Sequence, residues 1–395
     1  MSYDSKATPV GFVFINDGHD WHGGLNYFRS LFLALQSEPE CSVRPVAFVG
    51  AGADIPAYGF PSNVRIVQHR VFDRGTVPWL ANKLVQRLSG APAVTNRVLR
   101  REGIRLLSHG APTRNRVLRA IGWIPDFQHV HLPQFFPADE LVVRNRQYRE
   151  LIERSDLLVV SSEAALADLQ RFAPALAHKG RVLRFSAIRP DVTGSERLDL
   201  HATYGLDRPY FYLPNQFWAH KDHLTAIRAL AELRQRHPGI RIVCSGSLTD
   251  YRNPGHLDKL RAEIDRLGLS AHFLLLGSIP YPHIAQLMLG AVAVVNPSLS
   301  EGWSTTVEEA KALGVPLVLS AIAVHREQCQ RGEAIFFEPG DSSGLAARLE
   351  EQLGGWQDMR RDPSVALEAH RQRTQQFARA YERVVAEAVA LEDRA

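Results

Sequence analysis

Short apolar runs alternate with amphipathic patterns along the first half of the chain. Runs of strand length occupy residues 10–15, 43–49, 64–68, 104–108 and 157–161. After the first run, residues 25–35 place Leu25, Phe28, Leu31, Phe32 and Leu35 on one helical face. Buried strands that alternate with helices are typical of a parallel sheet covered on both faces, so we expect an α/β fold.

A second series of the same kind begins near Tyr210. Strands are expected at residues 210–213, 240–245, 273–276, 291–296 and 316–320, and helices at 222–237, 256–267, 282–289 and 306–313. Pro, Gly and Ser cluster between Ile188 and Asp207, which predicts a junction there. We therefore expect a Rossmann-like domain at 1–195, a second at 196–370, and a C-terminal helix at 371–395 that packs back on the first. Two doubly wound sheets would face a central cleft, where ligands bind at the carboxyl ends of the strands.

The composition is that of a soluble protein, with 45% hydrophobic and 22% charged residues. No apolar run reaches the roughly 18 residues that span a bilayer, and the N-terminus has no apolar signal core, so we expect a cytoplasmic location. The three cysteines are far apart and predict reduced thiols.

Positive charge is concentrated between residues 70 and 119, where eleven Arg or Lys side chains face only Asp73 and Glu102 as acids. Such a segment either attracts phosphates, acidic glycans or lipid headgroups, or is a solvated surface. The apolar residues beside these charges are Trp79, Leu80, Leu84, Val85 and Leu88. They could rest peripherally on the inner face of a membrane. Nucleic acid is not expected as a partner because its recognition motifs are absent.

The segment 296–310 follows an apolar strand and opens a helix. Gly302 allows a tight turn, and Thr305 with Glu308 fits a capping box in which Thr305 is the N-cap. Glu308 is therefore interpreted as structural. A helix start at this point offers backbone N–H groups to an anion such as a diphosphate. The residues expected to line it are Gly302, Trp303, Ser304, Thr305 and Thr306.

Two acids flank this helix start. Glu301 precedes it and Glu309 lies one turn inside it. Carboxylates accept hydrogen bonds from sugar hydroxyls, so the pair could hold a sugar and a ribose on either side of a diphosphate. On spacing alone, the alternative that both acids merely favour the helix N-terminus is equally good.

Glu301 and Glu309 enclose seven residues, and this arrangement resembles the E-x7-E signature of family 4 glycosyltransferases. The flanking P-S-x-x-E-G-W and E-A-x-A-x-G-x-P patterns resemble that family as well. The resemblance implies a GT-B fold, a retaining reaction, contact of Glu301 with the donor sugar and contact of Glu309 with the nucleotide ribose. The sequence departs from the family at Ser304 and Thr306, where Gly and Pro are frequent, so the donor pocket is expected to be shaped differently.

Residues 213–223 resemble the strand–loop–helix segment in which the family carries a Gly-Arg pair and then a Lys. Lys221 matches that Lys, and its compact ammonium could neutralise a leaving diphosphate. Asn215 or Gln216 stands near the place of the missing Arg. The alternative is a solvated lysine beside a core Phe-Trp pair.

Weaker signals come from three short segments. The Gly23-Gly24 pair follows the first strand, as in the family, and is expected to approach the donor phosphates. Ser245 and Gly246 follow a strand and are expected to line the cleft. Ile279 lies in a turn that resembles the base-binding turn of the family. The loop residues around the first pair, which could reach either substrate, are Asn16, Asp17, His19 and His22.

Residues 123–136 resemble the H-D-x6-P-E-x-F segment of the family. Pro125 stands where the family's His often lies, whereas Asp126 keeps the acidic position. His129 is the better remaining histidine. We expect Asp126 and His129 to orient an acceptor hydroxyl.

These observations predict a retaining transferase that moves a hexose from a nucleotide-diphosphate sugar to a glycan or lipid-linked acceptor in bacterial surface polysaccharide synthesis. No cofactor and no metal are expected, since the chain has no D-x-D motif and no histidine pair at ligand spacing. The alternatives are a nucleotide-sugar epimerase on a similar scaffold and a non-catalytic sugar-nucleotide binding protein.

Overall fold

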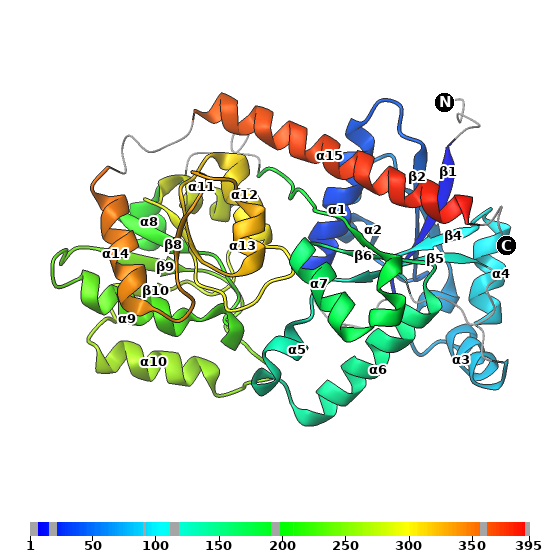
Figure 1. Cartoon of the computed structure of the whole chain (residues 1–395), viewed down its shortest axis with the longest axis horizontal. Helices are drawn as coiled ribbons and strands as arrows, with labels where there is room; N and C mark the ends of the chain where they lie inside the picture. Colours follow the sequence, from blue (N-terminus) through cyan, green and yellow to red (C-terminus); the bar gives the residue numbers. More distant parts are fainter. Residues whose placement is uncertain are drawn as a thin grey trace. The chain divides into compact units, whose positions relative to one another are not determined.

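The computed structural model of the chain describes residues 7–15, 22–89, 92–110, 118–190, 198–207, 209–355 and 362–391. Its strands form two separate sheets in which every recorded pairing is parallel, with helices around each sheet (Figure 1). The predicted α/β class is therefore confirmed.

The first sheet has seven strands in the order β3-β2-β1-β4-β5-β6-β7. Their bounds are β1 Thr8–Val13, β2 Val43–Val49, β3 Arg65–Gln68, β4 Leu106–Ser108, β5 Arg119–Ile124, β6 Leu157–Val160 and β7 Gly180–Val182. The accompanying helices are α1 His22–Ser37, α2 Ile55–Tyr58, η1 Arg70–Phe72, α3 Val77–Ser89, α4 Ala93–Arg101, α6 Ala138–Arg154, α7 Glu163–Phe172 and η3 Pro174–Lys179.

The second sheet has six strands in the order β10-β9-β8-β11-β12-β13. Their bounds are β8 Tyr210–Leu213, β9 Arg241–Cys244, β10 Phe273–Leu275, β11 Val294–Asn296, β12 Leu317–Ser320 and β13 Ile335–Phe337. The accompanying helices are α5 Gln128–His131, η2 Pro133–Phe135, α8 Leu200–Tyr204, η4 Ala219–Lys221, α9 His223–Leu233, α10 His256–Arg266, α11 Tyr281–Gly290, α12 Thr305–Leu313, α13 Ala323–Gln328 and α14 Ser342–Leu353.

Alternate residues of the second sheet enter two different cores. Phe211 and Leu213 of β8 pack with residues of α9, α10 and α14 on one face, whereas Tyr210 and Tyr212 pack with residues of α11 and α12 on the other. This is the two-residue side-chain period of a strand. Because both faces are covered, the strand sequences read as continuous apolar runs, which made them predictable.

The chain crosses between two compact units several times. Unit 1 contains Met1–Phe127, Val143–Ile188 and Gln372–Ala395, and unit 2 contains Gln128–Val142 and Arg189–Arg371. The expected boundaries were 195 and 370. The assignment of Gln128–Val142 to unit 2 was not anticipated from the sequence, and α15 (Pro363–Ala390) begins in unit 2 and continues in unit 1.

An aromatic cluster occupies the core of unit 1. Tyr27 stacks on Trp123 with ring centroids 4.4 Å apart, and its hydroxyl lies 2.8 Å from His109 Nε2. Burial lowers the pKa of His109 to about 3. Tyr381 of α15 is fully buried beside Phe12, with ring centroids 6.3 Å apart. The C-terminal part of α15 is therefore a component of this core.

Strand β5 shows why some elements were not predicted. Its sequence begins with Arg119 and places Gly122 within the run, which interrupts the apolar pattern. Gly122 is needed because a Cβ there would lie 2.4 Å from Ser155 Oγ. Strands β7 and β13 have only three residues each and carry too little pattern to recognise.

Candidate functional site

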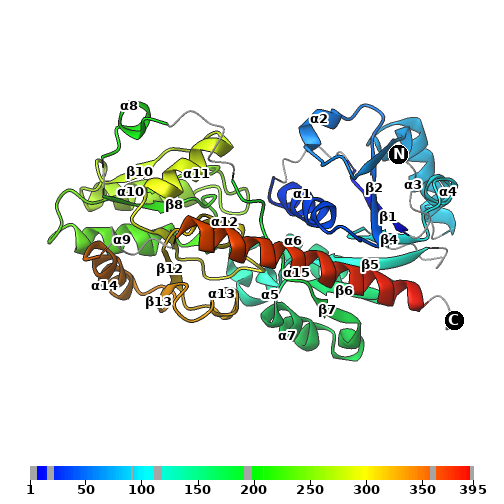
Figure 2. The ribbon, with the colours of Figure 1, turned by 90° about the horizontal axis from the view of Figure 1, so that it is seen from above.

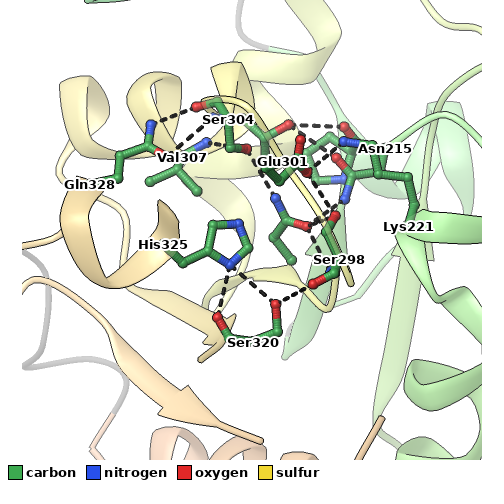
Figure 3. A network of polar contacts seen from close by, with 12 residues as sticks. Asn215, Lys221, Ser298, Glu301, Ser304, Val307, Ser320, His325 and Gln328 are labelled. Atoms are coloured by element: carbon green, nitrogen blue, oxygen red, sulfur yellow. Dashed lines mark hydrogen bonds and ion pairs between the residues drawn. The ribbon is translucent and has the colours of Figure 1, made fainter. Parts of the chain in front are cut away.

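A network of polar side chains lies at the carboxyl ends of three neighbouring strands of unit 2 (Figure 3). Asn296 ends β11, Ser320 ends β12 and Asn215 follows β8. Asn296 Oδ1 accepts from Asn215 Nδ2 at 3.1 Å and from Ser298 Oγ at 2.6 Å, and its Nδ2 donates to Ser304 Oγ at 3.0 Å. These bonds join the loop after β8 to the loop after β11, at the sheet edge where ligands of α/β proteins bind.

Lys221 and Glu301 form a largely buried ion pair in this network. Lys221 Nζ lies 2.6 Å from Glu301 Oε1, and Ser298 Oγ donates to the same oxygen at 2.7 Å. The side chains are only 18% and 9% exposed. Burial alone would raise the pKa of Glu301, but Lys221 is the main cause that lowers it, to about 2. The carboxylate is therefore ionised at neutral pH and holds the ammonium group in place.

The backbone around Lys221 is set by the residue that follows it. Asp222 has a φ of 50°, in the left-handed region, and caps α9 by accepting from Thr225 N at 3.3 Å. The turn lets η4 end at Lys221 and α9 begin at His223. The lysine is thus held in a tight connection between two helices.

The start of α12 differs from the prediction. The N-cap is Ser304, which has extended φ and ψ and accepts from Val307 N at 3.4 Å, so Thr305 is the first helical residue. The capping box proposed for Thr305 and Glu308 is therefore wrong. Glu308 instead accepts from Gln328 Nε2 at 3.0 Å and lies 3.8 Å from Lys311 Nζ.

Gln328, from α13, holds the backbone of Ser304 on both sides. Its Oε1 accepts from Ser304 N at 3.2 Å and its Nε2 donates to Ser304 O at 2.8 Å. Because Ser304 N donates to a protein side chain, the expectation that this amide faces a phosphate is not met. The N–H groups of Thr305 and Thr306 precede the first intrahelical bond, which runs from Glu308 N to Ser304 O.

Glu309 has an environment opposite to that of Glu301. It is 8% exposed and accepts from the hydroxyl of Tyr281 at 2.9 Å. Burial raises the pKa of Glu309 to about 7, although the Tyr281 bond acts in the other direction. Tyr281 opens α11, two residues after Ile279, so the second glutamate and the predicted base-binding turn are brought together.

Close packing of two loops explains why a glycine is required at position 246. Its φ is +142°, and a Cβ there would lie 2.6 Å from the carbonyl oxygen of Asn215. The neighbouring Ser245 is buried and lies 2.5 Å from the hydroxyl of Tyr212. Gln216 is exposed. The structure therefore brings Ser245 and Gly246 next to Asn215. The hydroxyl of Ser245 is hydrogen-bonded to Tyr212.

Ser320, His325 and Gln328 are parts of the network that the sequence analysis missed. Ser320 Oγ donates to Ser298 O at 2.6 Å, and His325 Nδ1 lies 2.9 Å from Ser320 O. A carbonyl can only accept, so this ring nitrogen carries the proton. The position of Ser320 at the end of an expected strand was the available signal, because neighbouring strands end at the same edge.

Residues 201–366 match the family described as glycosyl transferases group 1. This region of the chain is therefore similar to a group 1 glycosyltransferase domain and is called the group 1 domain below. It contains Lys221, Glu301 and Glu309, together with every residue labelled in Figure 3.

Known proteins resemble the chain over different lengths. D-inositol 3-phosphate glycosyltransferase of Corynebacterium urealyticum is 26% identical over 185 residues, which is 44% of this chain and 42% of that relative. HepE of Anabaena in complex with UDP-glucose matches with a TM-score of 0.69 and 18% identity, over 97% of this chain and 99% of that one. WaaG, a glycosyltransferase of lipopolysaccharide biosynthesis, gives a TM-score of 0.61 and 16% identity over 96% and 98%. The two structural likenesses confirm the GT-B fold.

Several predicted residues lie outside the group 1 domain. Gly23 and Gly24 lie in the first turn of α1, and Asp126 follows β5; all three belong to unit 1. His129 lies in α5, belongs to unit 2 and is 2% exposed, with its ring edge-on to Phe136. Asn16, Asp17 and His19 and the side chain of His22 fall outside the described residues.

Within the part of the chain that the structure describes, no group of three or more His, Cys, Asp or Glu residues is arranged to hold a metal ion. No helix of this described part combines the length and the apolar character needed to cross a membrane.

Proposed function

We propose that the chain is a retaining glycosyltransferase that moves a hexose from a nucleotide-diphosphate sugar to a glycan or lipid-linked acceptor. The observation that carries this proposal is the buried Lys221–Glu301 pair at the strand ends of the group 1 domain, with Glu309 on the helix that follows. The UDP-glucose complex of the structurally similar HepE supports a nucleotide sugar as donor.

Each charged residue would have one role. Glu301 would accept hydrogen bonds from the donor sugar, and Glu309 would accept them from the ribose. Lys221 and the N–H groups of Thr305 and Thr306 would stabilise the negative charge that develops on the departing diphosphate. This charge balance within the protein is the reason for proposing transfer without a metal.

The reaction would proceed on one face of the sugar. The acceptor oxygen forms a bond to the anomeric carbon while the bond from that carbon to the phosphate oxygen breaks. The departing phosphate oxygen takes the proton of the acceptor hydroxyl. Asp126 and His129 are proposed to orient that hydroxyl, and Gly23 with Gly24 to let the backbone approach the donor phosphates.

The test is a screen of nucleotide sugars against the purified chain by thermal shift and by hydrolysis. We expect one nucleotide sugar to raise Tm and to be hydrolysed slowly, and Glu309→Gln to lose both effects. Glu308→Gln is the matched control, since this adjacent carboxylate contacts Gln328 and not Tyr281. The proposal fails if no nucleotide sugar binds, or if Glu309→Gln keeps full activity.

Three further measurements separate the finer parts of the proposal. Proton NMR of the product reports whether the α-linkage of the donor is kept. Activity in the presence of EDTA reports whether a metal is needed. Product analysis without acceptor distinguishes a transferase, which releases free sugar and nucleotide, from an epimerase, which converts the nucleotide sugar, and from a binding protein, which leaves it unchanged.

The acceptor and the cellular setting rest on resemblance. We propose a role in bacterial surface polysaccharide synthesis at the inner face of the membrane, in line with the involvement of WaaG in lipopolysaccharide biosynthesis. Comparison of soluble glycans with lipid-linked acceptors in the same transfer assay tests this part.

A further inference from the structure

Helix α3 presents an unusual apolar stripe to solvent. Val77, Leu80, Leu84 and Leu88 are 78%, 53%, 59% and 80% exposed. Their spacing of three, four and four residues places them on one face of the helix. Single exposed leucines are ordinary, but four large aliphatic side chains along one helix face are a contiguous patch of the kind that marks an interaction site.

The other side of α3 is fixed by packing, so the stripe is a stable feature of the fold. The helix contacts η1 and α4, which lies beside it in both views (Figures 1 and 2). Asn82 is buried, and its Oδ1 accepts from Thr95 N, which belongs to α4, at 3.2 Å. Trp79 and Val85, which the sequence analysis grouped with the exposed leucines, are partly covered.

Positive charge flanks the stripe without compensating acids. Lys83 and Arg87 are exposed on α3, and α4 adds Arg97, Arg100 and Arg101, all exposed. The sequence from residue 77 to residue 101 contains no Asp or Glu. An apolar helix face bordered only by cations is complementary to a surface that offers anions above an apolar interior.

We propose that α3 docks on an anionic lipid bilayer, with Leu80, Leu84 and Leu88 inserted at the headgroup boundary and the Lys and Arg side chains of α3 and α4 on the phosphates. A second copy of this chain fits less well, because the same face would bring like charges together. A nucleic acid fits less well too, because its phosphates would leave the aliphatic stripe uncovered. This surface lies in unit 1, outside the group 1 domain, and its function does not depend on the proposed transfer reaction.

The experiment is co-sedimentation of the whole chain with vesicles of phosphatidylcholine alone or of phosphatidylcholine with phosphatidylglycerol. We expect binding to the anionic vesicles that weakens as salt is raised. Leu84→Gln with Leu88→Gln should lower the partition coefficient by about tenfold or more, since two buried aliphatic contacts are lost. Lys83→Gln with Arg87→Gln should lower binding to the anionic vesicles only.

The matched control is Val142→Gln, which changes a residue that is 70% exposed on α6 and should bind like the unaltered chain. Circular dichroism and thermal melting check that each variant is folded. The proposal is overturned if the unaltered chain does not bind anionic vesicles at low salt, or if the leucine variant binds them as well as the control does. It is also overturned if the leucine variant changes the mass in solution from dimer to monomer, which would assign the stripe to a second copy, or if polyuridylate binds in place of the vesicles.

Discussion

The pKa values of the two glutamates of one short motif are shifted in opposite directions by their surroundings. Glu301 accepts hydrogen bonds from Lys221 and Ser298; burial acts to raise its pKa, but the charge of Lys221 is the main cause that lowers it, to about 2. Glu309 has the single hydroxyl of Tyr281 as its recorded hydrogen-bond donor, and burial raises its pKa to about 7. The sequence shows two equivalent acids, whereas the three-dimensional surroundings make one a fixed counter-ion and the other a group poised near neutrality.

Replacement of Glu301 should destabilise the protein in a pH-dependent way. Because the pKa of Glu301 is lower in the folded state than the usual value near 4.3, the carboxylate contributes stability above about pH 4 that is lost as pH falls toward 2. We expect Glu301→Gln to lower the free energy of unfolding at pH 7 by on the order of 2–4 kcal/mol. The deficit should shrink to roughly half at pH 3. Urea unfolding at the two pH values measures this.

The control for that prediction is Glu301→Gln combined with Lys221→Met. Removing both charges should cost less stability than removing either one, since no buried charge is left without its partner. A double variant that loses the sum of the two single losses would contradict the importance of the pair.

Replacement of Glu309 should have the opposite effect on stability. The pKa of Glu309 near 7 in the folded state lies above its value in the unfolded state. The protonated side chain therefore contributes stability to the fold at low pH, and this contribution is lost as pH rises through 7. Glu309→Gln avoids this loss and should be more stable than the unaltered chain at pH 8, by on the order of 1–3 kcal/mol, with a smaller difference at pH 5. Thermal melting at both pH values tests this, and equal destabilisation at both would refute it.

At the scale of elements, the N-terminus of α12 is stabilised by its own N-cap residue and by a side chain from the neighbouring helix α13. Ser304 accepts from Val307 N, and Gln328 of α13 fixes the Ser304 backbone. The loop that carries Glu301 is thereby joined to α12 and α13 in one hydrogen-bonded unit. The cap therefore links helix stability to the geometry of the site.

Removal of the cap tests the assignment of Ser304 against Thr305. We expect Ser304→Ala to lower the free energy of unfolding by about 1–2 kcal/mol, because it removes the acceptor for Val307 N and a partner of Asn296. Thr305→Ala should cost less than half as much, since Thr305 is the first helical residue. Chemical denaturation of both variants measures these losses. A larger loss of unfolding free energy for Thr305→Ala than for Ser304→Ala would show that Thr305 is the N-cap after all.

At the scale of the whole molecule, Arg252 and its neighbours Tyr251 and Asn253 attach one segment from the first half of the sequence to the rest of unit 2. The Arg252 guanidinium lies 4.3 Å from the ring centroid of Phe136 and 4.5 Å from that of Trp218, and its Nε is 3.2 Å from Glu140 Oε1. Trp218 precedes η4, which carries Lys221. Arg252 thus connects the Gln128–Val142 segment to the loop of the buried ion pair.

Arg252→Ala should release that segment locally without unfolding the chain. Loss of the cation–π contacts and the ion pair should lower hydrogen-exchange protection of residues 128–142 by roughly tenfold or more. Arg228→Ala is the control, because Arg228 is also ion-paired, with Glu263, but is 53% exposed. Hydrogen-exchange mass spectrometry measures this protection. If residues 128–142 are equally protected in both variants, Arg252 does not hold the segment in place.

The sequence alone was sufficient for features encoded locally and insufficient for those encoded by tertiary contacts. The strands of the second sheet were predictable because they are continuous apolar runs, and Lys221 and Glu301 because they follow such strands in a recognisable motif. The cap was assigned one residue too late, since Ser304 and Thr305 are both good capping types and only the backbone angles distinguish them. The attachment through Arg252 joins residues more than a hundred positions apart, and no local pattern indicates it.

The order in which the ribosome makes this chain does not match the order in which its units can be completed. Phe377 and Tyr381 are buried in unit 1, yet they emerge after every residue of unit 2 has been synthesised. Unit 2 can therefore close first, while the nascent aromatic cluster around Tyr27 still lacks its last two rings. A translation product that stopped near residue 370 would leave that cluster open to chaperones and to aggregation, although its group 1 domain would be intact.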